Sequence, residues 1–127
     1  ATTIPFLYMG VNFRFADVDP TTLNINVQHV RELVNEKTKA IICVHYGGLP
    51  CDMDELQAIA REYNIPIIED AAHALGATYK GKPIGSISDF TMYSFQAIKH
   101  ITTGDGGMLI VQDPALVAKG ERIRWFG

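Results

Sequence analysis

The stretch Pro66-Ile67-Ile68-Glu69-Asp70 has the pattern of a strand that is buried on both faces, and it ends on two carboxylates. A second apolar run, Phe90 to Phe95, leads to Lys99, and a glycine-rich turn at residues 104–107 follows. A lysine at the end of a buried strand loses hydration, which favours the neutral amine that attacks carbonyl carbons. We therefore expect a reactive lysine and a strand-end carboxylate in one sheet.

Each of these signals has a simpler explanation when it is taken singly. Asp70 is a good N-cap residue, and Ala71-Ala72-His73-Ala74 has the composition of a first helical turn. A lysine after a strand is commonly a solvated loop residue. Together, and in this order, the lysine and the carboxylate are the groups that pyridoxal phosphate chemistry requires of a protein: a Schiff-base amine and a partner for the pyridinium nitrogen.

Strand-like and helical segments alternate in the first seventy residues. Strands are predicted at residues 11–18, 39–45 and 66–69, and helices at residues 27–34 and 52–63. Asp52 is the expected N-cap of the second helix, Glu55 completes a capping pattern, and Asn64 ends the helix. This alternation favours a parallel sheet with crossover helices.

After Asp70 the pattern changes. Two short strands are predicted around a turn at residues 80–82, then strands at residues 89–95 and 107–111, and a helix over residues 114–125. Because no helix separates the last two strands, the sequence predicts an α/β fold with a mostly parallel, mixed sheet. Ligands gather at the carboxyl ends of strands in such sheets, so His45, Asp70 and Lys99 are expected at one edge.

Composition excludes several classes of function. The 127 residues fit one modest domain, and a hydrophobic share of 47% is enough for a packed core. The net charge of -3 lacks the basic footprint of a nucleic-acid or anionic-membrane binder, and the apolar runs are too short to span a bilayer. Cys43 and Cys51 show neither metal-ligand spacing nor a disulfide framework, which fits a reducing, cytoplasmic setting, and Cys43 is expected to be a small buried hydrophobe.

Three motifs, in this order, resemble the DegT/DnrJ/StrS family. They are Glu69-Asp70-Ala71-Ala72-His73-Ala74, Lys80-Gly81-Lys82-Pro83-Ile84-Gly85 and the stretch from Ser94 to Gly107. Weaker similarity at residues 15–19, 44–48 and 123–127 extends the resemblance over nearly the whole chain. Members are fold-type I, pyridoxal phosphate-dependent sugar aminotransferases. The resemblance therefore implies the large domain of that fold, a three-layer sandwich of the aspartate aminotransferase type with a mostly parallel mixed sheet.

The resemblance also implies roles for four side chains toward pyridoxal 5'-phosphate. Lys99 matches the Schiff-base lysine, which moves a proton once it has been displaced, and Asp70 matches the carboxylate that pairs with the pyridine nitrogen. His73 matches a position, usually Gln or His, beside the phenolic oxygen, and Ser94 matches a hydroxyl that contacts the phosphate. Simpler roles stay open for both: His73 as a helix residue that caps or packs, and Ser94 as a strand residue bonded to backbone.

The function implied by the resemblance is transfer of an amino group from an amino acid, glutamate in particular, to a nucleotide-linked keto-sugar. The family's active site lies at the interface of a homodimer. Dehydratases of the same family have histidine in place of the lysine, so Lys99 argues against that reaction. A non-catalytic scaffold or regulatory protein that kept the fold is a further alternative. A flavodoxin-like module would need a glycine-rich phosphate loop after its first strand, which the sequence lacks.

The match covers only the middle of the family's catalytic domain, so residues 1–127 correspond to the central part of the cofactor-binding large domain. An upstream Gly-Ser/Thr turn that helps to hold the phosphate and a smaller C-terminal domain lie outside it. We therefore expect the 127-residue chain to be inactive by itself. Phe6, Trp125 and Phe126 are expected to be exposed in it and to favour self-association.

Overall fold

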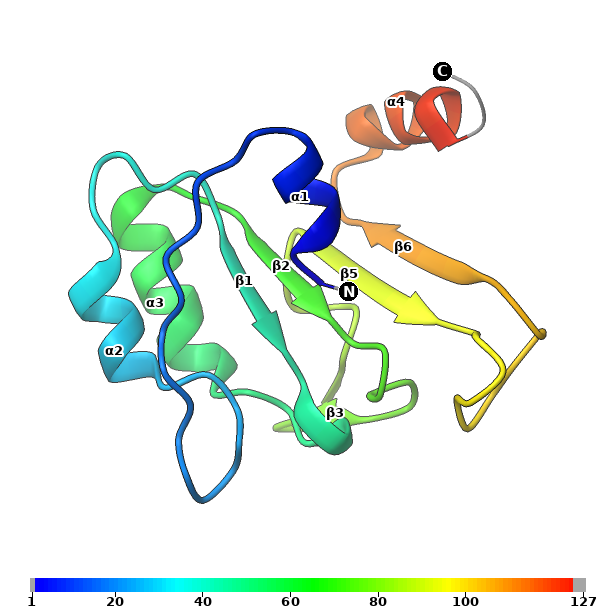
Figure 1. Ribbon diagram of the computed structural model, residues 1–127, viewed down its shortest axis with the longest axis horizontal. Helices are drawn as coiled ribbons and strands as arrows, with labels where there is room; N and C mark the ends of the chain where they lie inside the picture. Colours follow the sequence, from blue (N-terminus) through cyan, green and yellow to red (C-terminus); the bar gives the residue numbers. More distant parts are fainter. Residues whose placement is uncertain (1, 125–127) are drawn as a thin grey trace.

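A four-stranded mixed sheet forms the centre of the computed structural model, which describes residues 2–124. The strand order is β1-β2-β5-β6, with β1 at Ile41–Val44, β2 at Ile67–Asp70, β5 at Phe90–Ser94 and β6 at Gly107–Val111. β1, β2 and β5 run parallel, whereas β6 pairs antiparallel with β5 (Figure 1). The predicted mixed, mostly parallel sheet is confirmed.

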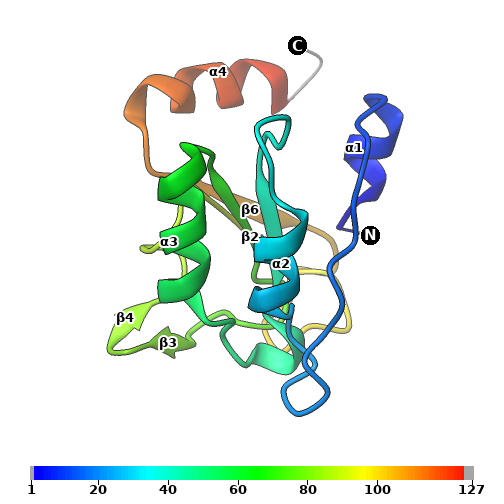
Figure 2. The same cartoon turned by 90° about the vertical axis from the view of Figure 1, so that its left-hand side faces the viewer.

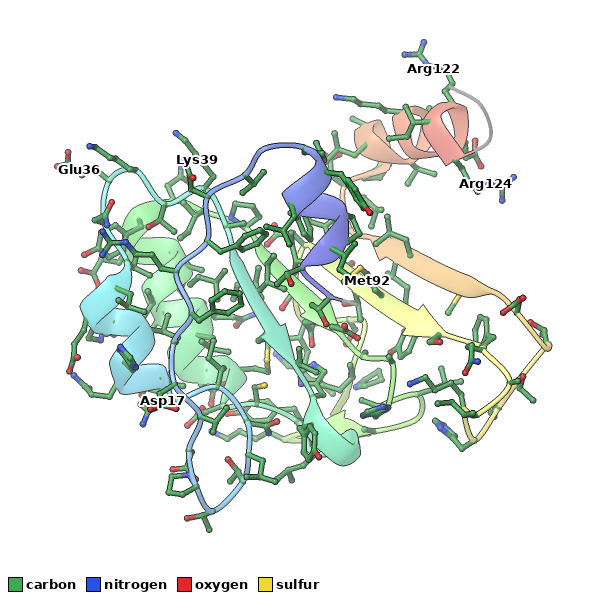
Figure 3. The ribbon with its side chains drawn as sticks, viewed as in Figure 1. Asp17, Glu36, Lys39, Met92, Arg122 and Arg124 are labelled. Carbon is green, nitrogen blue, oxygen red and sulfur yellow. The ribbon has the colours of Figure 1, made fainter. Side chains whose placement is uncertain are left out.

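Helices lie on both faces of this sheet. α2 (Val27–Leu33) and α3 (Met53–Tyr63) cover one face, and the short α1 (Ile4–Tyr8), which the sequence pattern did not reveal, lies on the opposite side (Figure 2). α4 (Pro114–Arg124) follows β6, and Arg122 and Arg124 project outward from its last turn (Figure 3). Trp125 and Phe126 lie outside the described residues. None of the helices within residues 2–124 is long and apolar enough to cross a membrane.

The apolar core lies between α3 and the sheet. Met53, Leu56 and Ile59 share one face of α3, and each is fully buried. They pack with Cys43 of β1 and Ile67 of β2. Burial alternates along both strands, because successive side chains point to opposite faces. The sequence pattern predicts that β1 and β2 are buried on both faces. In the structure their side chains are fully buried on the α3 face and half-buried on the other face.

The predicted hairpin after Asp70 is confirmed. β3 (Thr78–Tyr79) pairs antiparallel with β4 (Lys82–Pro83), and the turn between them contains Gly81 at φ +81°. Lys80, in the same turn, forms an ion pair with Asp54 of α3 and lies over the Tyr79 ring. These contacts hold the hairpin against the first turn of α3.

The start of α3 differs in detail from the prediction. Asp52 occupies the N-cap position but makes no side-chain cap hydrogen bond. The predicted N-cap position is therefore confirmed, but the capping hydrogen bond is not formed, because the carboxylate accepts one from the Tyr79 hydroxyl at 2.8 Å instead. Asn64 ends the helix as predicted, in the left-handed conformation that closes many helices.

Residues 11–18 form no strand, contrary to the prediction. The segment runs beside the sheet as coil, and Val18 makes an isolated bridge with Ile25. Phe6 lies edge-on to Phe13 with the ring centroids 6.2 Å apart, and it is half-buried rather than exposed as predicted. Alternating polarity indicates which side chains can share a face, but a strand also needs a backbone partner. The segment pairs with none of the named strands within residues 2–124.

Candidate active site

The carboxyl ends of β1, β2 and β5 lie at one edge of the sheet, where their arrows point the same way (Figure 1). The register pairs Asp70 with Met92, and alternation along β5 places Ser94 on the same face as Met92. That face is the one on which α1 lies, with Met92 beside it (Figure 3). The structure thus brings Asp70 and Ser94 to the same face of this edge of the sheet, which we call the site edge.

Asp70 ends β2, and donors hold its carboxylate from two sides. Its Oδ1 accepts the N–H of Ala72 at 3.1 Å, and its Oδ2 accepts the Thr2 hydroxyl at 2.6 Å. Residues 71–77 form two successive turns and no helix, the first closed by the N–H of Ala74 on the Ala71 carbonyl at 2.9 Å. The alternative in which Asp70 caps a helix is therefore wrong, and its half-buried carboxylate lies at the site edge.

His73 lies on the first of these turns, and its side chain is exposed. Its ring lies edge-on to the Tyr46 ring, with the centroids 6.4 Å apart. Tyr46 belongs to the short 3-10 turn that follows β1, Tyr46–Gly48. Gly48 has φ +86° and approaches the His73 carbonyl so closely that a Cβ would lie 2.8 Å from the oxygen. Glycine thus lets the two turns pack together, which fixes the backbone that carries His73.

Lys99 lies in the loop between β5 and β6. The loop begins with a tight turn in which the N–H of Lys99 donates to the Gln96 carbonyl at 2.9 Å. A bridge between Gln96 and Gly104 closes the loop at its base. Lys99 is half-buried, although every other residue from 96 to 109 is exposed. Lys99 is thus half-buried rather than buried at a strand end as predicted, because β5 ends at Ser94 and Lys99 lies in the loop that follows.

His100 links the Lys99 loop to the turns that follow Asp70. Its Nε2 is 3.2 Å from the Leu75 carbonyl oxygen, which accepts its hydrogen bond. This contact joins the two segments that carry the predicted reactive groups, although β2 and β5 are themselves separated by the hairpin in sequence. The side chain of His100, next to Lys99 in sequence, therefore contacts the backbone at Leu75.

Glu69, the other carboxylate of the strand, points to the opposite face and is completely buried. Its Oε2 lies 2.7 Å from Nε2 of His45, which is also fully buried, and its Oε1 accepts the Thr91 hydroxyl at 3.1 Å. The network joins β2 and β5 to the residue that directly follows β1. The sequence pattern did not reveal this network. Glu69 lies two residues after the buried Ile67, however, so its side chain points to the same buried face of the strand.

Two influences on the His45 ring oppose each other. Burial lowers the pKa of His45, while hydrogen bonds to Cys51 and Glu69 raise it to about 9, which favours a charged ring. The backbone N–H of Cys51, however, donates to Nδ1 at 3.1 Å, and this bond requires a lone pair on that atom. We therefore describe His45 as the neutral ring that carries its proton on Nε2 and donates it to Glu69.

Two further buried titratable groups, Cys43 and Tyr93, have local structural partners. Cys43 is 1% exposed, as predicted, and a hydrogen bond with Cys51 together with burial raises the pKa of its thiol well above the usual value. Burial likewise raises the pKa of Tyr93, whose hydroxyl donates to the Ile84 carbonyl at 2.6 Å. Cys43 belongs to the core beneath α3, and Tyr93 belongs to a second apolar cluster with Ala71, Ala74 and Ile84.

We expect Glu69→Ala to destabilise the full-length protein by about 2–6 kcal/mol, because each of two buried donors that loses its acceptor costs about 1–3 kcal/mol. The change leaves the His45 Nε2–H and the Thr91 hydroxyl without their acceptor. Urea unfolding measures the loss. Glu62→Ala is the control, because Glu62 pairs with Arg31 at the surface and should cost at most about 1 kcal/mol. Equal losses in the two variants would contradict the structural role of Glu69.

The comparison with known families bears on the whole chain. The profile of the DegT/DnrJ/EryC1/StrS aminotransferase family matches residues 1–127. The chain belongs to this family. The resemblance seen in the sequence motifs is thereby confirmed, and so is the predicted fold class.

Relatives of this DegT/DnrJ/EryC1/StrS chain are longer than it is. The spore coat polysaccharide biosynthesis protein SpsC of Bacillus subtilis is 44% identical over 119 residues, which cover 94% of this chain and 31% of SpsC. The structure of DesI, solved in the presence of its TDP-sugar product, is 36% identical with a TM-score of 0.92 and covers 99% of this chain and 32% of DesI. PseC of Helicobacter pylori, an aminotransferase involved in the biosynthesis of pseudoaminic acid, is 33% identical with a TM-score of 0.91 and covers 95% and 32%. The chain thus spans about a third of the length of these relatives.

The aminotransferases of this family depend on pyridoxal 5'-phosphate, and the residues at the site edge fit that group. Asp70 offers a half-buried carboxylate with acceptor sites beyond those used by its two donors, which suits a protonated ring nitrogen. The Ser94 oxygen accepts the N–H of Gln96 at 3.3 Å and keeps its own proton to donate to a phosphate oxygen. Lys99 supplies an amine on a four-carbon stem, which suits an aldehyde.

Proposed function

We propose that the full-length protein is a pyridoxal 5'-phosphate-dependent aminotransferase that moves an amino group from an amino acid, glutamate in particular, to a nucleotide-linked keto-sugar. The observation that carries the proposal is the Asp70 carboxylate at the carboxyl end of β2, which accepts one hydrogen bond on each oxygen. It lies beside the strand that leads to Ser94 and Lys99. The 127-residue chain is then the central part of the large domain. We further propose that the enzyme is a cytoplasmic homodimer.

Each residue of the site has a separate task in this proposal. Bound pyridoxal phosphate supplies an electron-accepting ring and an aldehyde carbon to which amines attach. Asp70 holds the proton on the ring nitrogen, His73 donates to the phenolic oxygen, and Ser94 donates to the phosphate. Lys99 would hold the cofactor at its aldehyde carbon and, as a free amine, would move a proton at the substrate carbon.

The relatives support the class of amino acceptor. DesI was solved in the presence of its TDP-sugar product, PseC is involved in the biosynthesis of pseudoaminic acid, and SpsC is a spore coat polysaccharide biosynthesis protein. These three contexts favour an activated sugar over a free keto acid as the acceptor. Lys99 favours amine transfer over dehydration, because dehydratases of the family have histidine at the matching position.

Absorption spectra and borohydride trapping of the full-length protein with pyridoxal phosphate test the proposal. We expect a visible absorption band that borohydride removes, with the reduced cofactor found on Lys99 by peptide mass spectrometry. Glutamate alone should then convert the bound cofactor to its amine form. A nucleotide keto-sugar should restore the first spectrum and yield an amino-sugar.

Three outcomes would contradict parts of this proposal. Attachment of the cofactor to another lysine would remove the role of Lys99. Attachment to Lys99 without amine transfer from any amino acid would indicate a scaffold or regulatory protein. Amine transfer to simple keto acids but to no nucleotide sugar would overturn the substrate class and leave the chemistry intact.

A further inference from the structure

The Asp70 carboxylate receives a hydrogen bond from a residue that lies far away in the sequence. The Thr2 hydroxyl donates to Oδ2 at 2.6 Å, while the N–H of Ala72 donates to Oδ1 at 3.1 Å. A length of 2.6 Å is typical of a hydroxyl that donates to a charged carboxylate. The Ala72 bond is local to the turn that follows β2. The Thr2 bond instead joins the segment before α1 to the end of β2.

Thr2 does not serve the helix that it precedes. Thr3 occupies the N-cap position of α1 and makes no side-chain cap hydrogen bond, although its carbonyl accepts the N–H of Leu7 at 3.1 Å. A threonine hydroxyl at a helix start commonly caps that helix. The Thr2 hydroxyl is directed across to β2 instead, on the face of the sheet where α1 lies (Figure 2). Its contact therefore serves Asp70.

We propose that Thr2 is a positioning residue, whose hydroxyl holds the Asp70 carboxylate in the orientation that presents its remaining acceptor sites to the ring nitrogen of the cofactor. The inference rests on the proposed function. The terminal torsion of aspartate is broad, so a carboxylate held at one oxygen can turn. One donor on each oxygen fixes its plane. Each oxygen has two acceptor sites, so one on each is left for a ligand.

Thr2 acts through Asp70 in this proposal and does not touch the cofactor. Without the hydroxyl, Asp70 keeps its charge and its bond from Ala72 but loses its fixed plane. Cofactor binding must then pay for ordering the carboxylate, so the affinity of the apoprotein for pyridoxal phosphate falls. The fold should change little, because valine has the same branched shape as threonine and Thr2 is half-buried.

The test compares Thr2→Val, Thr2→Ser and Thr3→Val in the full-length protein. Titration of the apoprotein with pyridoxal phosphate, followed by absorbance, gives the dissociation constant of each variant. Thr2→Val should weaken binding by about tenfold to a hundredfold, the range for one hydrogen bond to a charged group. Thr2→Ser should restore most of the affinity, because it keeps the hydroxyl. Thr3→Val, the adjacent half-buried control, should bind as wild type does.

A double-mutant cycle shows whether Thr2 acts through Asp70. In an Asp70→Asn background, Thr2→Val should change the dissociation constant far less than it does in wild type. Wild-type affinity in Thr2→Val, loss in Thr2→Ser equal to that in Thr2→Val, or full additivity in the cycle would each overturn the inference while leaving the proposed function standing. A wild-type protein that does not take the cofactor onto Lys99 would overturn both.

Discussion

Lys99→Ala is expected to abolish amine transfer in the full-length protein and to leave non-covalent cofactor binding partly intact. The lysine has two tasks in the proposed reaction, attachment of the cofactor and movement of a proton. Proton transfer by a positioned side chain alone contributes about 10² to 10⁴ in rate, so loss of both tasks should lower kcat by at least about 10⁴-fold. Asp70 and Ser94 stay in place to hold the ring and the phosphate. Steady-state turnover and cofactor titration measure the two effects separately.

The structure indicates that this variant will fold. Lys99 is half-buried in a loop in which residues 96–98 and 100–106 are exposed, and the hydrogen bond that shapes the turn, from its N–H to the Gln96 carbonyl, belongs to the backbone. Stability should therefore change by no more than about 0.5 kcal/mol. Lys119→Ala, on the exposed surface of α4, is the matched control and should keep full activity. Near-normal turnover in Lys99→Ala would remove the lysine from the mechanism.

The parts of the fold that the sequence predicts correctly depend on apolar pattern and chain geometry. The run at residues 66–70 contains β2 and the run at 90–95 contains β5, as expected of short, mainly apolar runs with β-branched and aromatic residues in a sheet that helices cover. The lack of a helix between residues 89–95 and 107–111 predicts a mixed sheet, and the antiparallel pair of β5 with β6 makes the sheet mixed. Asn64 ended α3 as expected, because asparagine tolerates the left-handed conformation.

The parts that the sequence does not predict depend on partners that only the folded chain supplies. Residues 11–18 have the alternation of a strand, but none of the named strands within residues 2–124 pairs with them. Asp52 has the sequence context of a helix cap, but its carboxylate accepts a hydrogen bond from the Tyr79 hydroxyl instead of from the helix backbone. In both cases local preference is overruled by a contact made elsewhere in the fold.

The site shows the same division. The strand pattern alone predicts that Asp70 lies at the carboxyl end of β2 and that Ser94 lies at the carboxyl end of β5. The opposite orientations of Glu69 and Asp70 follow from the twofold repeat of a strand, once its buried face is known. The bond between Thr2 and Asp70 cannot be read from the sequence, because it joins residues that only the packing of α1 on the sheet brings together.

Glu69 and Asp70 thus do different work from adjacent positions. Glu69 faces the core, where its two oxygens accept hydrogen bonds from His45, which follows β1, and from Thr91 of β5. Asp70 faces the site, and its position is fixed because it ends β2, one of the strands that Glu69 holds in place. A change at Glu69 is therefore expected to lower stability first, whereas a change at Asp70 is expected to lower activity with the fold retained.

Asp70→Asn should lower kcat of the full-length protein by about a hundredfold or more, equivalent to about 2.7 kcal/mol or more in the barrier. Asparagine keeps the shape of aspartate, and its oxygen can still accept the N–H of Ala72. It lacks the negative charge that holds a proton on the ring nitrogen, so the ring accepts electrons less readily. Steady-state kinetics and urea unfolding, measured on the same preparation, separate this chemical loss from any loss of fold.

Asp113→Asn is the matched control for this variant. The Oδ1 of Asp113 accepts the N–H of Ala115 at 2.9 Å, the same contact with the second residue onward that Asp70 makes with Ala72, but at the start of α4. Both variants test that backbone contact, and only Asp70→Asn removes a charge from the site edge. Equal activity in the two variants would show that the Asp70 charge is dispensable. A cofactor-bound structure with the Asp70 carboxylate out of hydrogen-bond reach of the ring nitrogen would also refute its role, because the whole effect is assigned to that one contact.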